Sequence, residues 1–225
     1  MSRFETKFSI SNLAFDKIRY IIKTHPAIFN EIYYKRHVNN IYFDNLDFSS
    51  FKDNIEGVSE RKKVRIRWYG GLFGLCKNPV LEIKYKKGFL GWKEKHLLPD
   101  FNLNLNKGFN YEKIFFNLLK KKNYDLHKLK LQFLKPSLLN RYERIYYLSF
   151  NKKYRITLDN NMEFFSINPI NNHIKTFSDY EKNIVELKYD ENYRDDAVKI
   201  TNYLPFRMTK SSKYVIGLDR IGNWQ

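Results

Sequence analysis

Hydrophobic and polar residues alternate with a period of two along most of the chain, which is typical of half-buried β-strands. β-Branched and aromatic residues occupy many of the apolar positions. Turn signals separate several of the segments, notably GGLFG at 70–74 and KKG at 86–88. The predicted strands cover residues 3–10, 38–44, 61–69, 79–87, 92–98, 141–150, 154–159, 162–167 and 183–189.

Helical periodicity appears between these strands. Ser11 or Asn12 is a suitable N-cap for a helix that continues to Lys23. Residues 111–122, 126–134 and 193–203 are also predicted to be helical. The expected fold class is therefore α+β, with a mainly antiparallel sheet.

The strand predicted over residues 61–69 reads RKKVRIRWY and carries only cations on one face. The cations are Arg61, Lys63, Arg65 and Arg67, and the apolar residues of the other face are Val64, Ile66 and Trp68. Such a face fits a solvated outer surface, a nucleic-acid-binding patch, or one wall of a site for concentrated negative charge.

Two further features favour the third interpretation. Arginine has a planar, forked guanidinium that is suited to phosphate. The pattern Glu-x-Lys recurs on three predicted strands, as Glu5/Lys7, Glu82/Lys84 and Glu186/Lys188. This spacing places a carboxylate and an ammonium on the same strand face, roughly 7 Å apart.

A closed sheet would turn these charged faces into an internal surface. The expected architecture is an antiparallel β-barrel tunnel, with helices packed on the outside over the apolar faces. Cations inside a tunnel need counter-charge, because desolvating an unpaired cation is very costly. A bound polyphosphate group with its metal would supply that charge, and the carboxylates favour Mg²⁺ or Mn²⁺.

Composition adds few further limits. The chain has 225 residues, 43% hydrophobic, and is expected to form a single domain over residues 1–225. It contains no apolar run long enough for a transmembrane segment and no signal peptide, and it has one cysteine, so a cytoplasmic location is expected. Its 41 Lys and Arg against 24 Asp and Glu give a net charge of +17, which favours polyanionic partners.

Other catalytic arrangements are not indicated by the sequence. The histidines at positions 25, 37, 96, 127 and 173 lack metal-ligand spacing. Cys76 has no companion histidine motif, which argues against a nucleophilic role. Gly70 and Gly71 indicate a turn, and there is no Walker loop.

Eight short motifs occur in the order seen in VTC-type domains, the catalytic domains of polyphosphate polymerases within the triphosphate tunnel metalloenzyme superfamily. The chain resembles this family from about residue 3 to residue 219. The motifs are RFETKF (3–8), IYFDN (41–45), RIRWYG (65–70), LEIKYK (81–86), RYERIYY (141–147), YRITLD (154–159), VELKY (185–189) and SSKYVIGLD (211–219).

The resemblance implies roles for individual residues. The implied phosphate ligands are Lys7, Arg65, Arg67, Lys84, Arg144, Arg155, Ser212 and Lys213. The implied metal ligand is Glu186, with Glu5 and Glu82 as further acidic groups. Lys7, Arg65, Arg67, Lys84 and Glu186 are the implied catalytic residues. Tyr142 is expected to be a core aromatic that can also donate to phosphate.

One departure from the wider superfamily is informative. The hydrolase and cyclase branch, the CYTH proteins, usually opens with Glu-x-Glu-x-Lys, whereas this chain has Arg3 at the first acidic position. The change favours a polyphosphate polymerase, with ATP and polyphosphate as partners and Mn²⁺ or Mg²⁺ as cofactor. A CYTH-like triphosphatase that uses the same tunnel is the alternative. The chain lacks the regulatory and transmembrane segments of the eukaryotic complexes, so a free-standing, soluble version is expected.

Two interpretations from other classes remain. The charge and the aromatic content suit a nucleic-acid-binding protein, but the aromatics alternate away from the basic faces, so no nucleic acid is expected. A polyphosphate-binding protein without turnover is the other. Within 61–69, we expect Arg61 and Lys63 to lie at the tunnel mouth and attract substrate.

Overall fold

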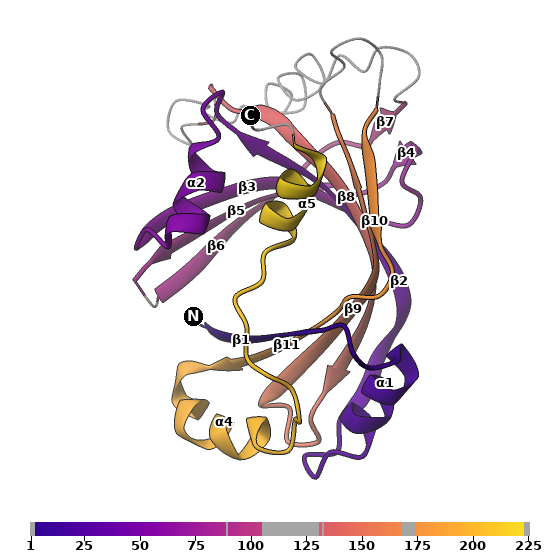
Figure 1. Ribbon diagram of the computed structural model, residues 1–225, viewed down its shortest axis with the longest axis vertical. Coiled ribbons are helices and arrows are strands. Elements are labelled where there is room, and N and C mark those ends of the chain that lie inside the picture. The colour runs from indigo at the N-terminus through magenta and orange to yellow at the C-terminus, as the bar shows by residue number, and fades with distance from the viewer. Residues whose placement is uncertain (1–2, 89, 105–130, 132, 168–173, 223–225) are drawn as a thin grey trace.

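We describe a computed structural model of the chain, which defines residues 3–88, 90–104, 131, 133–167 and 174–222 (Figure 1). The predicted helix 111–122 and most of the predicted helix 126–134 lie outside these ranges. No helix of the described part is long and apolar enough to cross a membrane.

Strands outnumber helices in the described chain. They are β1 (Arg3–Ile10), β2 (Asn30–Asp44), β3 (Glu60–Tyr69), β4 (Gly74–Cys76), β5 (Val80–Lys87), β6 (Leu90–Leu97), β7 (Phe101–Leu103), β8 (Lys135–Leu148), β9 (Tyr154–Phe165), β10 (Thr176–Asp179) and β11 (Asn183–Asp190). The helices are α1 (Phe15–Lys23), α2 (Ser49–Glu56), α4 (Arg194–Thr201) and α5 (Lys213–Ile221), with a 3-10 turn, η3, at Glu191–Tyr193.

The main predicted strands are present, but several boundaries differ from the predictions. The segments predicted at 154–159 and 162–167 form one strand, β9, because the chain continues through Asn160 and Asn161 without a turn. The first helix starts at Phe15 after Ala14, so Ser11 and Asn12 do not cap it as predicted. The helices α2 and α5 were not predicted.

One antiparallel sheet of nine strands carries the site, which confirms the predicted fold class. Its order is β1-β11-β9-β8-β2-β3-β5-β6, and β10 pairs with β9. The sheet is strongly curved, so that its two ends approach each other (Figure 1). The predicted barrel is not closed by backbone pairing, because β1 and β6 are not hydrogen-bonded to each other within the described residues.

The seam between the two ends of the sheet is crossed in other ways. The ammonium of Lys84 on β5 lies 2.9 Å from Glu5 Oε2 on β1. The segment 206–212, between α4 and α5, runs along the outer edge of β1, where the Thr209 N–H donates to the Lys7 carbonyl at 2.8 Å. This segment then continues along the concave side of the sheet to α5 (Figure 1).

The apolar faces of the first and last strands are covered from outside, as predicted. Ile18 and Ile22 of α1 and Ala197 and Ile200 of α4 belong to the same buried cluster as Ile156 of β9. These two helices lie on the convex side of the sheet (Figure 1). Burial of their apolar side chains favours folding by roughly 25 cal/mol per Å² of apolar surface.

The position of α5 corrects the prediction that all helices pack outside. Tyr214 and Leu218 of α5 pack in one cluster with Leu138 and Tyr142 of β8. Tyr142 and Arg144 alternate on β8 onto the same face, so α5 occupies part of the concave face that was expected to be wholly polar. Its approach is close: a Cβ at Gly217 would lie 2.5 Å from a methyl carbon of Leu138.

Candidate functional site

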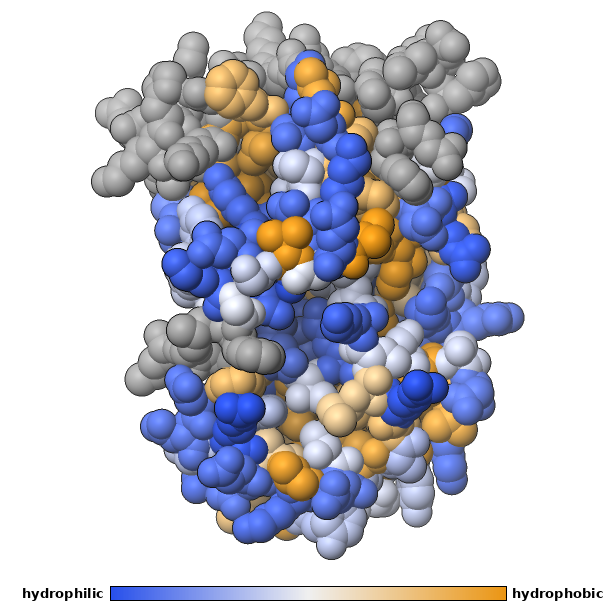
Figure 2. Space-filling view, turned by 60° about the vertical axis from the view of Figure 1, so that its left-hand side comes forward, coloured by the Kyte–Doolittle hydropathy of each residue, from blue (hydrophilic) through white to orange (hydrophobic). Residues whose placement is uncertain are grey.

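Charged side chains gather on the part of the concave face that α5 leaves open. Alternation of side chains along each strand places them there. Figure 2 shows hydrophilic residues around the recess at mid-height of the molecule. Cations outnumber carboxylates in this group, and each carboxylate is held by more than one cation.

Glu186 lies at one side of the site and is buried. Its carboxylate is 3.7 Å from the ammonium of Lys7 on β1 and 3.2 Å from that of Lys188 on β11. Burial alone would raise the pKa of Glu186, but Lys188 and Lys7 hold it well below its usual range. Glu186 is therefore ionised at neutral pH.

Glu5 joins this group across the seam. Its carboxylate is 2.9 Å from the Lys84 ammonium and 3.7 Å from the Lys188 ammonium, so Lys188 bridges Glu5 and Glu186. Although burial opposes it, the charges of Glu186 and Glu5 raise the pKa of Lys7. The predicted residues Lys7, Lys84, Glu5 and Glu186 are thus brought together.

Glu82 lies in a separate set of ion pairs on the opposite wall. Arg65 Nε donates to its carboxylate at 2.8 Å and the Lys93 ammonium at 2.7 Å, and an Arg67 nitrogen lies at 3.7 Å. Burial would raise the pKa of Glu82, but these three cations lower it strongly. The structure does not bring Glu82 together with Glu5 and Glu186 as a third metal-binding carboxylate. Glu82 instead orients the side chains of Arg65 and Arg67.

Asp159 was not predicted and organises the next pair of cations. The Arg144 guanidinium makes a forked contact with it, at 2.5 Å and 2.7 Å, and the Lys213 ammonium lies at 2.5 Å. Asp159 is fully buried, and although burial alone would raise its pKa, Arg144 and Lys213 lower it. The alternation of Arg155, Thr157 and Asp159 in YRITLD was the available signal.

Tyr142 has the core position expected of it, and its hydroxyl lies among the cations of the site. It is buried in the cluster under α5, and its hydroxyl accepts a hydrogen bond from Arg67 at 3.2 Å. Arg67 also donates to the side chain of Asn40 at 2.9 Å. The Arg144 guanidinium and the Lys213 ammonium lie over the Tyr142 ring, at 5.1 Å and 4.5 Å from its centre. This ring therefore supports cations from two walls of the site.

Lys63 lies further inside than predicted. Its ammonium donates to Ser212 Oγ at 2.9 Å, and no carboxylate lies within ion-pair distance among the described residues. Burial and the charges of neighbouring cations, chiefly Lys7 and Lys84, lower its pKa to about 7. Lys63 is thus a buried cation of the site without a carboxylate partner in the described part of the chain.

The segment before α5 supplies polar groups. The Lys7 ammonium donates to the Ser211 carbonyl at 3.1 Å, and Ser212 receives Lys63. Arg155 lies on the same strand face as Asp159, opposite Lys188, and its buried Nε has no hydrogen-bond partner in the described part of the chain. Ser212, Lys213 and Arg155 thus lie where the predicted anion would be.

The donor set limits how a metal could be held. No group of three or more His, Cys, Asp or Glu side chains in the described ranges has an arrangement that could hold a metal ion. Glu186 and Glu5 remain as two neighbouring carboxylates. Mg²⁺ is commonly bound by one or two carboxylates together with substrate phosphates and water, so this pair fits such an ion.

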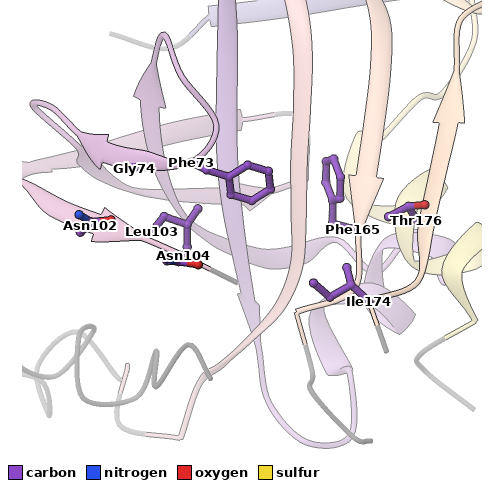
Figure 3. A pocket seen from close by; sticks show the side chains of 8 residues that line it. All are labelled: Phe73, Gly74, Asn102, Leu103, Asn104, Phe165, Ile174 and Thr176. Atoms are coloured by element: carbon purple, nitrogen blue, oxygen red, sulfur yellow. The ribbon is translucent and has the colours of Figure 1, made fainter. Parts of the chain in front are cut away.

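An apolar pocket of about 400 Å³ lies apart from these charges (Figure 3). Its lining residues are Phe73, Gly74, Asn102, Leu103, Asn104, Phe165, Ile174 and Thr176. None of them is charged, so this pocket does not provide the anion site.

Comparison with known proteins agrees with this geometry. A family model described as VTC domain matches residues 2–221. A candidate adenylyl cyclase from Hippeastrum, described as having a dominant triphosphatase activity, superposes with a TM-score of 0.54 at 14% identity, covering 99% of this chain and 97% of that chain. A candidate adenylate cyclase from Vibrio parahaemolyticus gives 0.53 at 10% identity, covering 96% and 98%. At such identities the likeness shows the fold. Curated protein sequences give no match.

Proposed function

From the premise that this chain belongs to the VTC domain family, we propose that it transfers the γ-phosphate of ATP to inorganic polyphosphate and releases ADP. The family and the fold support an enzyme that acts on triphosphates. The observation that carries the proposal is the excess of half-buried cations on the concave face, where Lys63 has no carboxylate partner in the described part of the chain. A chain of phosphates has the charge density that this surface needs.

The two walls bind the substrate from opposite sides. Arg65 and Arg67 are held in place by Glu82, and Arg144 and Lys213 by Asp159. Side chains fixed in this way need little reorganisation when charge redistributes during the reaction, which is how preorganised sites stabilise transition states. Lys63 of β3 and Lys7 of β1, whose ammonium groups reach Ser212 Oγ and the Ser211 carbonyl, bind the remaining phosphate oxygens.

A divalent ion, Mn²⁺ or Mg²⁺, would be held by Glu186, with Glu5 beside it. The ion would neutralise charge on the β- and γ-phosphate oxygens. An ion held by Glu186 would weaken the attraction of this carboxylate for Lys7, which would leave the Lys7 ammonium available to phosphate, whereas Lys188 would still pair with Glu5. Glu186 is already ionised, so no proton has to leave before an ion binds.

The reaction needs no general base from the protein. An anionic oxygen of the terminal phosphate of the acceptor chain forms a bond to the γ-phosphorus. The bond between the γ-phosphorus and the β–γ bridging oxygen breaks, and its electron pair leaves with ADP. The protein contributes positioning and charge neutralisation.

A triphosphatase is the second candidate, because water can attack the same phosphorus in the same geometry. The activity described for the Hippeastrum protein, which shares the fold, favours this alternative. The two candidates differ in the acceptor and hence in the product.

The test is to incubate the purified protein with ATP and Mn²⁺ and analyse the products. Long anionic polymer with ADP supports the polymerase, and free phosphate with ADP but without polymer supports the triphosphatase. Glu186→Gln should lower turnover at least a hundredfold, because it removes the carboxylate charge at the proposed ion site. Glu181→Gln, at an exposed position before β11, is the matched control. Normal turnover by Glu186→Gln would contradict the assigned role.

A further inference from the structure

A group of tyrosines surrounds an arginine on the concave face, next to the charged site. Its members are Tyr33 and Arg36 of β2, Tyr69 of β3 and Tyr146 of β8. The Arg36 guanidinium lies over the rings of Tyr33, Tyr146 and Tyr69, at 4.2, 5.2 and 5.3 Å from their centres. We refer to these four residues as the aromatic platform.

The platform is continuous with the proposed phosphate site. In the sheet register, Tyr33 pairs with Tyr146, Tyr146 with Thr157, and Thr157 with Glu186. Tyr146 therefore lies on the same face as Glu186, two strands away, or about 10 Å. The Arg144 guanidinium, which is held by Asp159, lies 5.7 Å from the centre of the Tyr146 ring. A ligand on the platform can thus reach the phosphate site without leaving the concave face.

Large parts of the aromatic platform are exposed to solvent, so its tyrosines do not serve to fill the core. Tyr33 and Tyr69 are 53% and 43% exposed, although both lie on a face that is buried elsewhere along the strands. Arg36 has no hydrogen bond and no ion pair with any described residue. The rings instead fix it: Tyr33 and Tyr146 meet edge to face at 5.5 Å, and the Tyr69 and Tyr146 hydroxyls lie 3.4 Å apart.

The chemistry of the platform differs from that of the phosphate site. The cations around Glu186 and Glu82 present N–H groups, which suit phosphate oxygens. The platform presents ring faces and one delocalised cation. Such a surface stacks with the face of a nucleobase, and stacking on aromatic residues and arginine is a common way to bind bases.

We propose that the aromatic platform stacks the purine base of the nucleoside triphosphate whose phosphates lie between Arg65 and Lys7. This inference rests on the function proposed above and adds the nucleoside end of the substrate. It also sets the direction in which the nucleotide binds. The base lies over β2 and β8, next to Tyr33 and Tyr146, and the triphosphate extends from there toward Glu186 and Lys63.

The test compares ATP with inorganic triphosphate, which has the phosphates but no base. Their affinities are measured by calorimetry, in the same metal and buffer, for the wild type, Tyr33→Ala, Arg36→Met and Tyr33→Trp. Tyr20→Ala, at an exposed tyrosine of α1 on the convex side, is the matched control. Tyr33→Ala and Arg36→Met should each weaken ATP about tenfold, because stacking contributes strongly per base. Inorganic triphosphate should change less than twofold, and Tyr33→Trp should retain ATP binding.

The outcomes separate the two proposals. If the wild type binds neither ligand, the proposed function fails, and the platform proposal fails with it. If the wild type binds both, but Tyr33→Ala and Arg36→Met leave ATP unchanged or weaken both ligands equally, only the platform proposal is overturned. Loss of ATP affinity alone, with Tyr20→Ala unchanged, supports a nucleobase on the platform.

Discussion

The two ends of the concave face have the same strands and opposite chemistry. On β8, Leu138 and Tyr142 pack under α5, and Arg144, one position further along the same face, is bound to Asp159. At the first end, the apolar side of α5 covers the strand face. At the second end the protein leaves cations such as Lys63 without carboxylates.

This difference indicates what each end must contact. An apolar strand face is stabilised by any apolar helix that fits it, and the chain can encode that helix. A half-buried cationic surface is not stabilised by burial, because the charges repel each other and lose water. Its stability increases when an anion binds, so the charged end should respond strongly to phosphate ligands, and the α5 end should not.

Leu218→Ala in α5 should give the largest change in stability. Leu218 is fully buried against β8, and removing its side chain leaves a cavity. The free energy of unfolding should fall by about 2–5 kcal/mol. Denaturant unfolding, followed by circular dichroism, measures it.

Turnover provides the control for this variant. Well below the unfolding midpoint, turnover per folded molecule should stay within about twofold of the wild type, because Leu218 belongs to the apolar cluster under α5. A large fall in turnover of fully folded Leu218→Ala would show that the two ends are not independent.

Lys63→Met should have opposite effects on binding and stability. Loss of a charged hydrogen-bond donor should weaken binding of inorganic triphosphate about tenfold or more. The pKa of Lys63 falls from its usual 10.5 to about 7 on folding. A protonated Lys63 therefore destabilises the folded wild-type protein, fully below about pH 7 and less as the pH rises toward 10.5. The variant should therefore be more stable than the wild type below pH 7, and the difference should shrink between pH 7 and about 10.5.

Unfolding of ligand-free protein at pH 6 and pH 10 measures the stability change, with Lys52→Met on the exposed side of α2 as control. Calorimetry of the wild type at pH 8, in buffers of different ionisation enthalpy, should detect proton uptake when triphosphate binds. If Lys63→Met is less stable than the wild type at pH 6, the protonated Lys63 ammonium does not destabilise the folded state, and this prediction is wrong.

Arg61→Ala should have the smallest effect. Arg61 lies two residues before Lys63 on the same face of β3, and its charge contributes to the lowered pKa of Lys63. Its removal should slow triphosphate association a few-fold at low salt and reduce the salt dependence, with little change at high salt. Stopped-flow association rates at two ionic strengths test this, and an equal loss at both would indicate a direct phosphate contact instead.

The faces of individual strands could be predicted from the sequence, because a period of two is a local property. Arg65, Arg67 and Lys84 lie on the concave face as expected. Which carboxylate binds which cation depends on strand register and on the order of strands, both of which are non-local. For this reason Glu82 was grouped with Glu5 and Glu186, although the pairing of β3 with β5 places it against Arg65.

The position of α5 depended on a different kind of information. The spacing of Tyr214, Leu218 and Ile221 is helical, and Ser212 precedes the helix as its N-cap, so the helix itself was detectable. The side of the sheet on which α5 packs could not be predicted from the sequence, because apolar residues occur on both faces of β8. The close approach of Gly217 to Leu138 and Phe164, and the packing of Leu218 in the same cluster, place the helix on the concave side.

The open seam has a consequence for how molecules of this protein meet one another. A sheet with two free edges offers both as templates for strand addition by a second molecule. The outer edge of β1 is occupied by its own chain, through Met208 and Thr209. The edge at β6 is protected by composition instead, since Lys93, Glu94 and Lys95 lie in its centre. The two edges of the open sheet are thus protected from edge-to-edge aggregation in different ways, one by a covering segment of the same chain and the other by charged residues.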